Sequence, residues 1–272
     1  MKDYHVHTYY SDDSIYPMKA VLNDCAARGI DELCFTEHVD YGMKQDWQPG
    51  LDPAIVTNCD YDRYFAEIEE CRKLYPYMTI KAGLEFGIQL ITLQDYERLY
   101  ERYKDRLDFI LLSVHEIGNL ELGGGRAFLQ GKGHLESHRQ YYENLLALVR
   151  NFKHYSVLAH MDLIVRYDPR GPVPFEDVKE LIAQILRQVI ADGKGLEINT
   201  SSRRYGTKGC CPSIDILKLY KELGGTILTF GSDSHKPEHL GAYIEEHKQL
   251  ARELGFTRYC TFSHMKPQFH EL

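Results

Sequence analysis

Histidines and carboxylates recur near the ends of the strands that we expect in this chain. Six of the thirteen histidines lie in five short segments, which read His5-Val6-His7, Thr36-Glu37-His38, Ser113-Val114-His115, Ala159-His160-Met161-Asp162 and Gly231-Ser232-Asp233-Ser234-His235. Imidazole nitrogens and carboxylate oxygens bind Zn²⁺, Fe²⁺ and Mn²⁺. Because strand residues i and i+2 point to the same side, His5 and His7 can hold one ion together. One such pair often arises by chance, but the repetition predicts a metalloenzyme.

The elements that must position these side chains alternate between apolar strands and amphipathic helices. We predict strands over 3–7, 31–36, 79–85, 109–114, 155–159, 195–199, 226–231 and 258–262. We predict helices over 17–28, 61–75, 93–103, 136–150, 175–192, 213–222 and 241–254. The polar, glycine-rich segments 39–59, 118–134 and 200–212 are expected to be loops over a site.

Strict alternation of strands and helices predicts a parallel sheet, which is either open or closed into a barrel. The candidate ligands follow nearly every strand, from the first to the last. A closed barrel brings all C-terminal strand ends around one mouth, whereas an open sheet would spread them over several strand spacings of ~4.8 Å each. We therefore predict an α/β barrel of seven or eight units.

Length and composition fit one large domain over residues 1–272, with 43% hydrophobic residues for its core. The net charge of −8 argues against a nucleic-acid-binding surface. No apolar run approaches the ~18 residues of a membrane span, and no hydrophobic leader precedes the first strand. We expect a cytoplasmic protein without a nucleic-acid or membrane partner.

The remaining cysteines and histidines carry weaker signals. The seven cysteines form no CxxC pair, so we expect small buried hydrophobes in a reducing compartment. Cys210 and Cys211 follow a glycine-bounded loop, where one of them could be an exposed thiol. The histidines outside the strand-end segments are expected mostly on the surface, with His134 and His138 on a lid; they are His134, His138, His154, His239, His247, His264 and His270.

Six motifs occur in a characteristic order: Asp3-Tyr4-His5-Val6-His7-Thr8, Cys34-Phe35-Thr36-Glu37-His38, Gly83-Leu84-Glu85, Ser113-Val114-His115-Glu116-Ile117-Gly118, Gly195-Leu196-Glu197-Ile198-Asn199-Thr200 and Gly231-Ser232-Asp233-Ser234-His235. With these motifs the chain resembles the PHP (polymerase and histidinol phosphatase) superfamily, and within it the PHP-type histidinol-phosphate phosphatases. The resemblance runs nearly end to end. It implies a distorted, TIM-like (β/α)₇ barrel with a trinuclear metal site at the C-terminal strand ends.

The resemblance also implies which side chains hold the three divalent ions, which would be Zn, Fe or Mn. The first ion would be held by His5, His7, Glu85 and Asp233. Glu85 would bridge to a second ion, also held by His115 and His160. The third would be held by Asp13, His38 and His235.

The third site departs from the family pattern. Many relatives have histidine where this chain has Asp13, and Asp12 is the competing choice. A carboxylate is an acceptable ligand but favours harder ions than imidazole does.

Phosphate-ester cleavage is the chemistry that such a centre would support. Two close ions can bridge a water and lower its pKa towards ~7, so that hydroxide attacks phosphorus. The charge that develops on the phosphoryl oxygens needs cations nearby. Arg166 and Arg204 could supply bidentate contacts, with Arg203 as the alternate to Arg204. Either arginine could instead be an ordinary solvated loop residue.

Three further residues could assist the reaction. Asp162 could orient His160, donate a proton to the leaving alkoxide, or only cap the following turn. Glu116 and Tyr167 could contact the amino or imidazole end of a substrate.

The function that we expect is hydrolysis of L-histidinol phosphate, a small phosphomonoester, in histidine biosynthesis. The alternatives are another PHP phosphoesterase, acting on phosphotyrosine proteins or small phosphodiesters, and a non-catalytic barrel module. The complete ligand set argues against the non-catalytic module. The motifs of nucleotide-binding loops and serine hydrolases are missing from the sequence.

Overall fold

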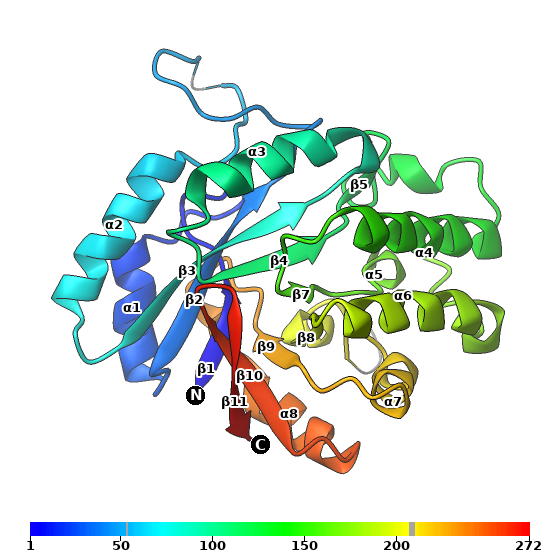
Figure 1. Ribbon diagram of the computed structural model, residues 1–272. Helices are drawn as coiled ribbons and strands as arrows, with labels where there is room; N and C mark the ends of the chain where they lie inside the picture. Colours follow the sequence, from blue (N-terminus) through cyan, green and yellow to red (C-terminus); the bar gives the residue numbers. More distant parts are fainter. Residues whose placement is uncertain (53, 207–209) are drawn as a thin grey trace.

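The computed structural model describes residues 1–52, 54–206 and 210–272. Over these residues, seven parallel strands form a nearly closed barrel with helices on its outside (Figure 1). In order around the barrel, the strands are β1 (Lys2–Val6), β2 (Glu32–Val39), β3 (Thr79–Gly87), β4 (Phe109–Ser113), β7 (Val157–Leu158), β8 (Gly195–Asn199) and β9 (Leu228–Gly231). The predicted distorted (β/α)₇ barrel is confirmed.

The helices follow the strands in the predicted alternation. They are α1 (Met18–Ala27), α2 (Tyr61–Leu74), α3 (Leu93–Tyr103), α4 (His134–Asn151), α5 (Ile164–Tyr167), α6 (Lys179–Ala191), α7 (Ile214–Glu222) and α8 (Ile244–Glu253). Their ends carry ordinary signals: Pro17 precedes α1, and the Asp60 and Ser213 side chains cap α2 and α7. The four-residue α5 was not predicted.

β1 and β9, the first and last strands of the barrel, are far apart in the sequence but lie side by side where the barrel closes. The His7 N–H donates to the Ser234 carbonyl at 2.8 Å, and the Ser234 N–H donates to the His5 carbonyl at 3.2 Å. Val6 and Ser234 form a parallel bridge. This contact brings His5 of β1 and His7, which follows β1, next to the segment that carries Asp233 and His235.

A bulge in β1 lets the side chains of two consecutive residues, Tyr4 and His5, point into the barrel. The register between β1 and β2 shifts between Asp3 and Val6, whereas neighbours in a regular strand face opposite sides. Tyr4 packs in a small interior cluster with residues such as Phe109 and Phe262. His5, the next residue, faces the carboxylates at the mouth. The bulge therefore lets β1 contribute to both the interior packing and the site.

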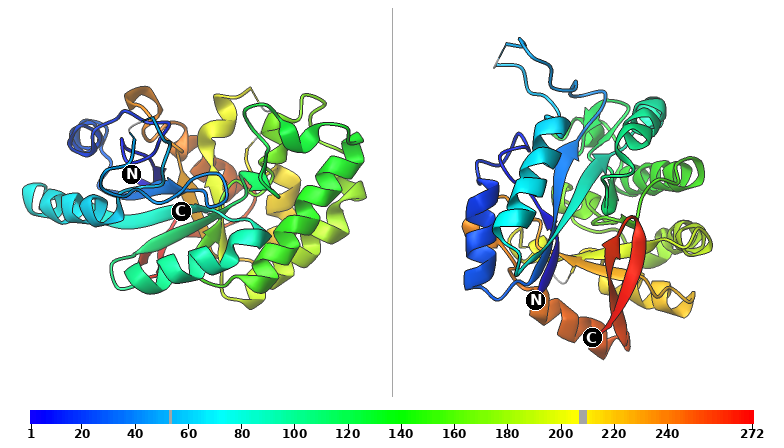
Figure 2. Two further views of the ribbon diagram at one scale, coloured as in Figure 1. Left: turned by 90° about the horizontal axis from the view of Figure 1, so that it is seen from above. Right: turned by 60° about the vertical axis from the view of Figure 1, so that its left-hand side comes forward.

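The C-terminal strand differs from the prediction. β10 (Arg258–Ser263) forms where a strand was expected, but it pairs antiparallel with β11 (Lys266–Glu271), which was not predicted. The hairpin lies outside the barrel sheet, near both chain termini (Figures 1 and 2). Cys260 and Phe262 of β10 close the interior cluster, and the Phe262 N–H donates to the Tyr4 hydroxyl at 3.0 Å. The hairpin thus plugs the barrel instead of extending it.

The three predicted loops lie between barrel elements, and each brings residues to the site. In segment 39–59, Asp40 and Lys44 line the central cavity, while a later part of its described residues projects from the molecule in Figure 1. Segment 118–134 includes β6 (Leu120–Glu121), which pairs with β5 (Glu116–Ile117). In segment 200–212, residues 207–209 lie outside the described residues.

Several expectations about burial were wrong. Cys210 and Cys211 are both buried, so neither is an exposed thiol. His138 and His247 are buried within α4 and α8, and His134 begins α4 instead of lying on a separate lid. Packing of amphipathic helices against the barrel explains this, because the inward face of a helix is buried whatever residue occupies it. Within the described part of the chain, no helix is long and apolar enough to cross a membrane.

Candidate metal centre

Glu85 of β3 lies at the centre of the barrel mouth, surrounded by imidazoles from four other strand ends. Its Oε2 faces ring nitrogens at 3.1, 3.4 and 3.1 Å, which belong to His5, His7 and His38. Its Oε1 faces ring nitrogens at 3.2 and 2.8 Å, which belong to His115 and His160. Ser113 donates to the same Oε1 at 2.6 Å. One carboxylate thus separates two groups of nitrogen donors.

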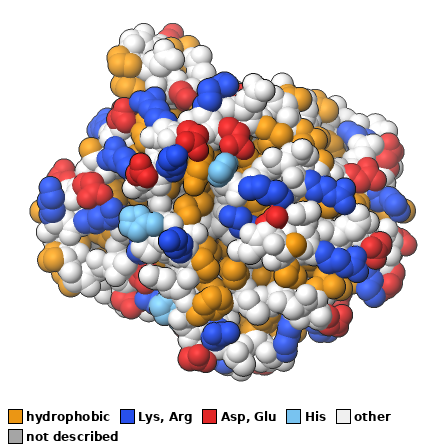
Figure 3. All heavy atoms as spheres, in the orientation of Figure 1, with side chains coloured by type: hydrophobic (Ala, Val, Ile, Leu, Met, Phe, Trp, Pro, Cys, Tyr) orange, Lys and Arg blue, Asp and Glu red, His pale blue; other side chains and the backbone are white. Residues whose placement is uncertain are grey.

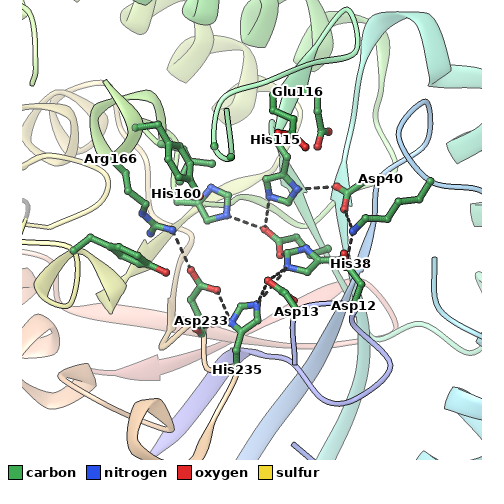
Figure 4. Close-up of a pocket in the computed structure, with 18 residues that line it drawn as sticks. Asp12, Asp13, His38, Asp40, His115, Glu116, His160, Arg166, Asp233 and His235 are labelled. Carbon is green, nitrogen blue, oxygen red and sulfur yellow. Dashed lines mark hydrogen bonds and ion pairs between the residues drawn. The ribbon is translucent and has the colours of Figure 1, made fainter. Parts of the chain in front are cut away.

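Asp233 and His235 approach this group from the opposite wall (Figure 4). Asp233 Oδ1 lies 3.6 Å from His5 Nε2, 3.7 Å from His7 Nε2 and 3.6 Å from His235 Nδ1. The His235 Nε2 lies 3.4 Å from His38 Nε2. The structure therefore brings residues from both ends of the chain into one cluster.

Asp13, rather than Asp12, faces the cluster. Asp13 Oδ2 lies 3.0 Å from His235 Nε2 and 3.6 Å from His38 Nε2. Asp12 turns to Lys44, whose Nζ lies 2.5 Å from its Oδ1. Lys44 also contacts Asp40 at 2.9 Å. The geometry favours Asp13 over Asp12 as the carboxylate nearest the histidines.

The polar atoms of the mouth fit divalent ions better than they fit one another. His7 Nε2 and His38 Nδ1 are buried without a hydrogen-bond partner among the described residues, although both face Glu85. Burial, with His235 and His38 nearby, lowers the pKa of His7 well below its usual value. Against the opposing effect of burial, His5 and His38 hold the pKa of Glu85 well below its usual range. His7 and Glu85 are thus in the forms that coordinate metals, a neutral imidazole and an ionised carboxylate.

Two carboxylates that were not predicted from the sequence contact histidines of the mouth on the side away from Glu85. Glu197 Oε1 lies 2.6 Å from His5 Nδ1, and its Oε2 accepts from the His160 N–H at 3.0 Å. Asp40 Oδ1 lies 2.8 Å from His115 Nδ1. A carboxylate on the outer nitrogen of a ligating histidine fixes the ring and its tautomer. Asp40 lies two residues after His38, which is the spacing of side chains on one face of a strand, so the sequence contained a possible signal for Asp40.

Glycines make room for both of these pairs. A Cβ at Gly87 would lie 2.0 Å from Asp40 Oδ1 and 2.7 Å from His115 Nδ1. A Cβ at Gly231 would lie 2.2 Å from Glu197 Oε1 and 2.3 Å from the His5 Cβ. Contacts this short are sterically impossible, so each carboxylate–histidine pair needs a glycine on the adjacent strand.

Arg166 lies in the cavity and Arg204 lies behind Asp233. The cavity at the mouth has a volume of about 420 Å³, and Arg166 lines it. Arg166 Nη1 lies 3.6 Å from Asp233 Oδ2, and its guanidinium stacks 4.3 Å from the Tyr205 ring centroid. Arg204 donates at 2.8 Å to the carbonyls of Ser232 and of Asp233. Its donation supports Asp233, whose φ of +54° is unusual for a residue other than glycine.

The alternate arginine and Asp162 point elsewhere. Arg203 pairs with Glu246 of α8 at the surface, 3.0 Å away. Asp162 accepts from the Cys211 thiol at 2.9 Å and from the Ser213 N–H at 2.8 Å. Its carboxylate therefore anchors the segment before α7.

Glu116 and Tyr167 both line the cavity. Glu116 is buried, its Oε2 has no hydrogen-bond partner among the described residues, and Glu121 lines the same wall. Burial and the charge of Asp40 raise the pKa of Glu116 to about 7. Tyr167 packs against Gly123 of the opposite loop. The cavity thus has a cationic side at Arg166 and an acidic side at Glu116 (Figure 4).

Two proteins described as a histidinol-phosphatase and a probable histidinol-phosphatase resemble this chain along nearly its full length. A histidinol-phosphatase of Lactococcus lactis subsp. lactis (strain IL1403) is 32% identical over 97% of this chain and 95% of its own. A probable histidinol-phosphatase of Thermotoga maritima is 26% identical over 94% of this chain and 93% of its own.

Solved structures agree with the fold. The crystal structure of the L. lactis histidinol phosphate phosphatase, complexed with Zn, L-histidinol and phosphate, superposes with a TM-score of 0.84 at 31% identity, and covers 98% of both chains. A putative histidinol phosphatase from Listeria monocytogenes has the same fold, with a TM-score of 0.77 at 20% identity, and covers 91% of this chain and all of its own.

The family model called PHP domain matches residues 3–201. That range includes His5, His7, His38, Glu85, His115 and His160, while Asp233 and His235 lie in the segment that follows β9. On this match and on the full-length relatives, the chain belongs to the PHP domain family.

Proposed function

We propose that this protein hydrolyses L-histidinol phosphate to L-histidinol and phosphate, as a step of histidine biosynthesis. The observation that carries the proposal is the arrangement of five imidazoles around the two oxygens of Glu85, beside an arginine in the same cavity. The solved L. lactis relative, which holds Zn, L-histidinol and phosphate, supports the same substrate for a chain of this similarity.

The proposal includes three divalent ions, of Zn, Fe or Mn. The first would be held by His5, His7, Glu85 and Asp233, and the second by Glu85, His115 and His160. The third would be held by Asp13, His38 and His235. Ions bound there would supply an activated water and positive charge beside the phosphoryl oxygens.

Arg166 is the residue that we assign to the phosphate. Its side chain is only 10% exposed, and the Tyr205 ring and Asp233 hold its guanidinium in place. A cation that is already oriented stabilises charge on a phosphoryl group without reorganising during the reaction. We assign Arg204 to positioning instead, because both of its terminal nitrogens already donate to the backbone at Asp233. Direct phosphate contact by Arg204 stays a prediction.

The acidic side of the cavity fits the other end of the substrate. Histidinol phosphate carries an amino group beside its phosphate ester, and an ammonium ion would satisfy the unpaired Glu116 Oε2. Such an ion would also favour the charged form of this carboxyl, whose pKa burial raises to about 7. Tyr167 would cover the substrate beside Arg166.

The distribution of charge on the surface also agrees with a small-molecule substrate. Basic and acidic side chains are interspersed on the face shown in Figure 3, and the chain carries a net charge of −8. Nucleic-acid binding depends on concentrated positive charge. We propose a cytoplasmic enzyme built as a single barrel domain over residues 1–272, with no nucleic-acid partner.

A phosphate-release assay on the metal-loaded protein tests this function. The substrates are L-histidinol phosphate, phosphotyrosine peptides and small phosphodiesters, and we expect the highest kcat/KM for L-histidinol phosphate. In H₂¹⁸O, attack of water on phosphorus breaks the P–O bond and places one label in the phosphate. Label in L-histidinol would mean C–O cleavage, and preference for another ester would move the activity to a different phosphoesterase.

A further inference from the structure

A second group of metal-binding side chains lies away from the barrel mouth, where the start of α4 meets the turn after α5. His134 and His138 are one helical turn apart, and Asp168 follows α5 directly. One ligand atom from each of the three lies within 4.8 Å of the others. Because positions i and i+4 share a helix face, both imidazoles can approach the same carboxylate.

One unsatisfied ring nitrogen of this group faces the carboxylate. His138 is 1% exposed, and its Nε2 has no hydrogen-bond partner among the described residues. This nitrogen lies 3.5 Å from Asp168 Oδ2. A buried ring nitrogen without a partner is unfavourable, and it points to a group that would complete it.

The hydrogen bonds of Asp168 leave room on the oxygen that faces His138. A carboxylate has about four acceptor positions. Arg170 uses two of them on Oδ1, through its N–H at 3.0 Å and its Nε at 2.8 Å, and one on Oδ2, through Nη2 at 2.8 Å. Arg170 also donates to Ser137 and to the Lys132 carbonyl. It therefore fixes the carboxylate in the manner of an outer partner in metal sites.

The distances lie within about 0.7 Å of the separations around a small tetrahedral ion. Bonds of about 2.0–2.1 Å to nitrogen and oxygen place tetrahedral ligands ~3.3 Å apart. Asp168 Oδ2 lies 3.5 Å from His138 Nε2 and 4.0 Å from His134 Nε2. His134 Nε2 donates to the Gly171 carbonyl at 2.8 Å, and with an ion in place of this proton the carbonyl offers a fourth donor.

The charge states of the group also suit coordination. Burial lowers the pKa of His138 to about 4, so this ring is neutral at neutral pH. Although burial acts against it, Arg170 lowers the pKa of Asp168, which stays ionised. A neutral imidazole and a carboxylate are ligands that need no proton release at neutral pH.

We propose that His134, His138 and Asp168 bind one divalent cation of the Zn²⁺ type, separate from the ions of the barrel mouth. Nitrogen donors and one carboxylate suit Zn²⁺ and related borderline ions better than Mg²⁺ or Ca²⁺. The ion ties α4 to the turn that begins immediately after Arg166 and Tyr167. Its role is to stabilise the segment that carries these two cavity residues.

Crystals of zinc-loaded protein, measured at the zinc absorption edge, test the proposal directly. We expect anomalous density between His138 Nε2 and Asp168 Oδ2, in addition to density at the barrel mouth. In His134→Gln crystals the density at α4 should disappear while that at the mouth remains. His134 is the better first variant because its side chain is 32% exposed, so its replacement disturbs packing less than that of buried His138.

Zinc content and thermal stability give a second readout. After chelation and reloading with Zn²⁺, His134→Gln and His138→Gln should each hold one ion fewer than the wild type and lose part of the zinc-dependent rise in Tm. The matched control is His154→Gln, since His154 has similar exposure but pairs with Glu97 far from the group. Wild-type zinc content in His134→Gln, or no density at α4 in loaded wild-type crystals, would overturn the proposal.

Discussion

His5 of β1 and Glu197 of β8 lie 2.6 Å apart, Nδ1 to Oε1, although they are 192 positions apart in the sequence. The other ring nitrogen of His5 faces Glu85 at 3.1 Å. Against the effect of burial, Glu197 and Glu85 raise the pKa of His5 well above its usual value in the metal-free protein. His115 repeats the arrangement between Asp40 and Glu85. In each of the two imidazoles, Nδ1 contacts an outer carboxylate and Nε2 faces Glu85.

Replacement of Glu197 tests whether this outer carboxylate positions His5. We expect Glu197→Gln to lose roughly 10–100-fold in metal affinity or activity, because the amide cannot hold the ring with a full charge. Glu197→Asp should recover part of the loss. Metal titration followed by kcat and KM gives the measurement, with exposed Glu180→Gln as control. Unchanged metal affinity in Glu197→Gln would leave Glu197 with a purely structural role.

Gly87 provides a test of the second pair that changes no polar group. The added methyl of Gly87→Ala would meet Asp40 Oδ1 and His115 Nδ1 at 2.0 and 2.7 Å, so one of them must move. We expect loss of metal at the His115 position and a destabilisation of about 1–3 kcal/mol from overpacking. The control is Gly125→Ala, where a methyl would meet nothing within 4 Å. Metal analysis and denaturant unfolding measure the two effects, and wild-type metal content would contradict the steric argument.

The barrel could be predicted from the sequence because its signals are local. Alternating strand and helix patterns gave the order of elements, and ligand-type residues at successive strand ends required closure. The C-terminal hairpin could not be predicted in this way. β11 (Lys266–Glu271) is mostly exposed and polar, with little apolar pattern, and it is a strand only because it pairs with β10. Such pairing is tertiary information.

The residues of the site could likewise be predicted where the signal is local, and not where it depends on tertiary contacts. The strand-end residues predicted as ligands converge in the structure, since the barrel brings strand ends together. Glu197 was missed as a contact of His5 because the two are 192 positions apart in the sequence. Arg166 and Arg204 looked equivalent as loop arginines, and only the folded chain, with Arg166 in the short helix α5, sends one to the cavity and the other to the backbone of Asp233. Loop conformation leaves little trace in local sequence.

The third proposed ion depends on Asp13. Asp13→Ala should lower the metal content by one ion per chain and reduce activity, because Asp13 is the carboxylate that faces the Nε2 atoms of both His235 and His38. Asp12→Ala should retain all three ions, since Asp12 contacts Lys44 instead. Elemental analysis of both variants under identical loading gives the comparison. The reverse order of the two variants would transfer the ligand to Asp12.

Glu116 should control recognition of the substrate's amino group. Glu116→Gln keeps the shape of the side chain and removes its charge, so we expect KM for L-histidinol phosphate to rise by about tenfold, or roughly 1.4 kcal/mol. A phosphomonoester without an amino group serves as the control substrate, and its KM should change little. Equal changes for both esters would show that Glu116 acts on the site as a whole and not on the ammonium ion.

Arg166 and Arg204 should lose activity for different reasons. Arg166→Ala should lower kcat/KM by about 10²–10³, or ~3–4 kcal/mol, by analogy with the loss of one preorganised donor to a developing oxyanion. Its metal content should stay intact, because Arg166 contacts Asp233 only at 3.6 Å. Arg166→Lys should restore little, since a lysine keeps the charge but not the bidentate fork.

In Arg204→Ala, by contrast, metal content and activity should fall together. Arg204 donates to the carbonyls of Ser232 and Asp233, and without it the strained backbone at Asp233 is free to relax away from the ions. Elemental analysis beside steady-state kinetics separates the two arginines. A variant of Arg204 that kept its metals but lost activity to the same extent as Arg166→Ala would place its guanidinium on the phosphate, as first predicted from the sequence.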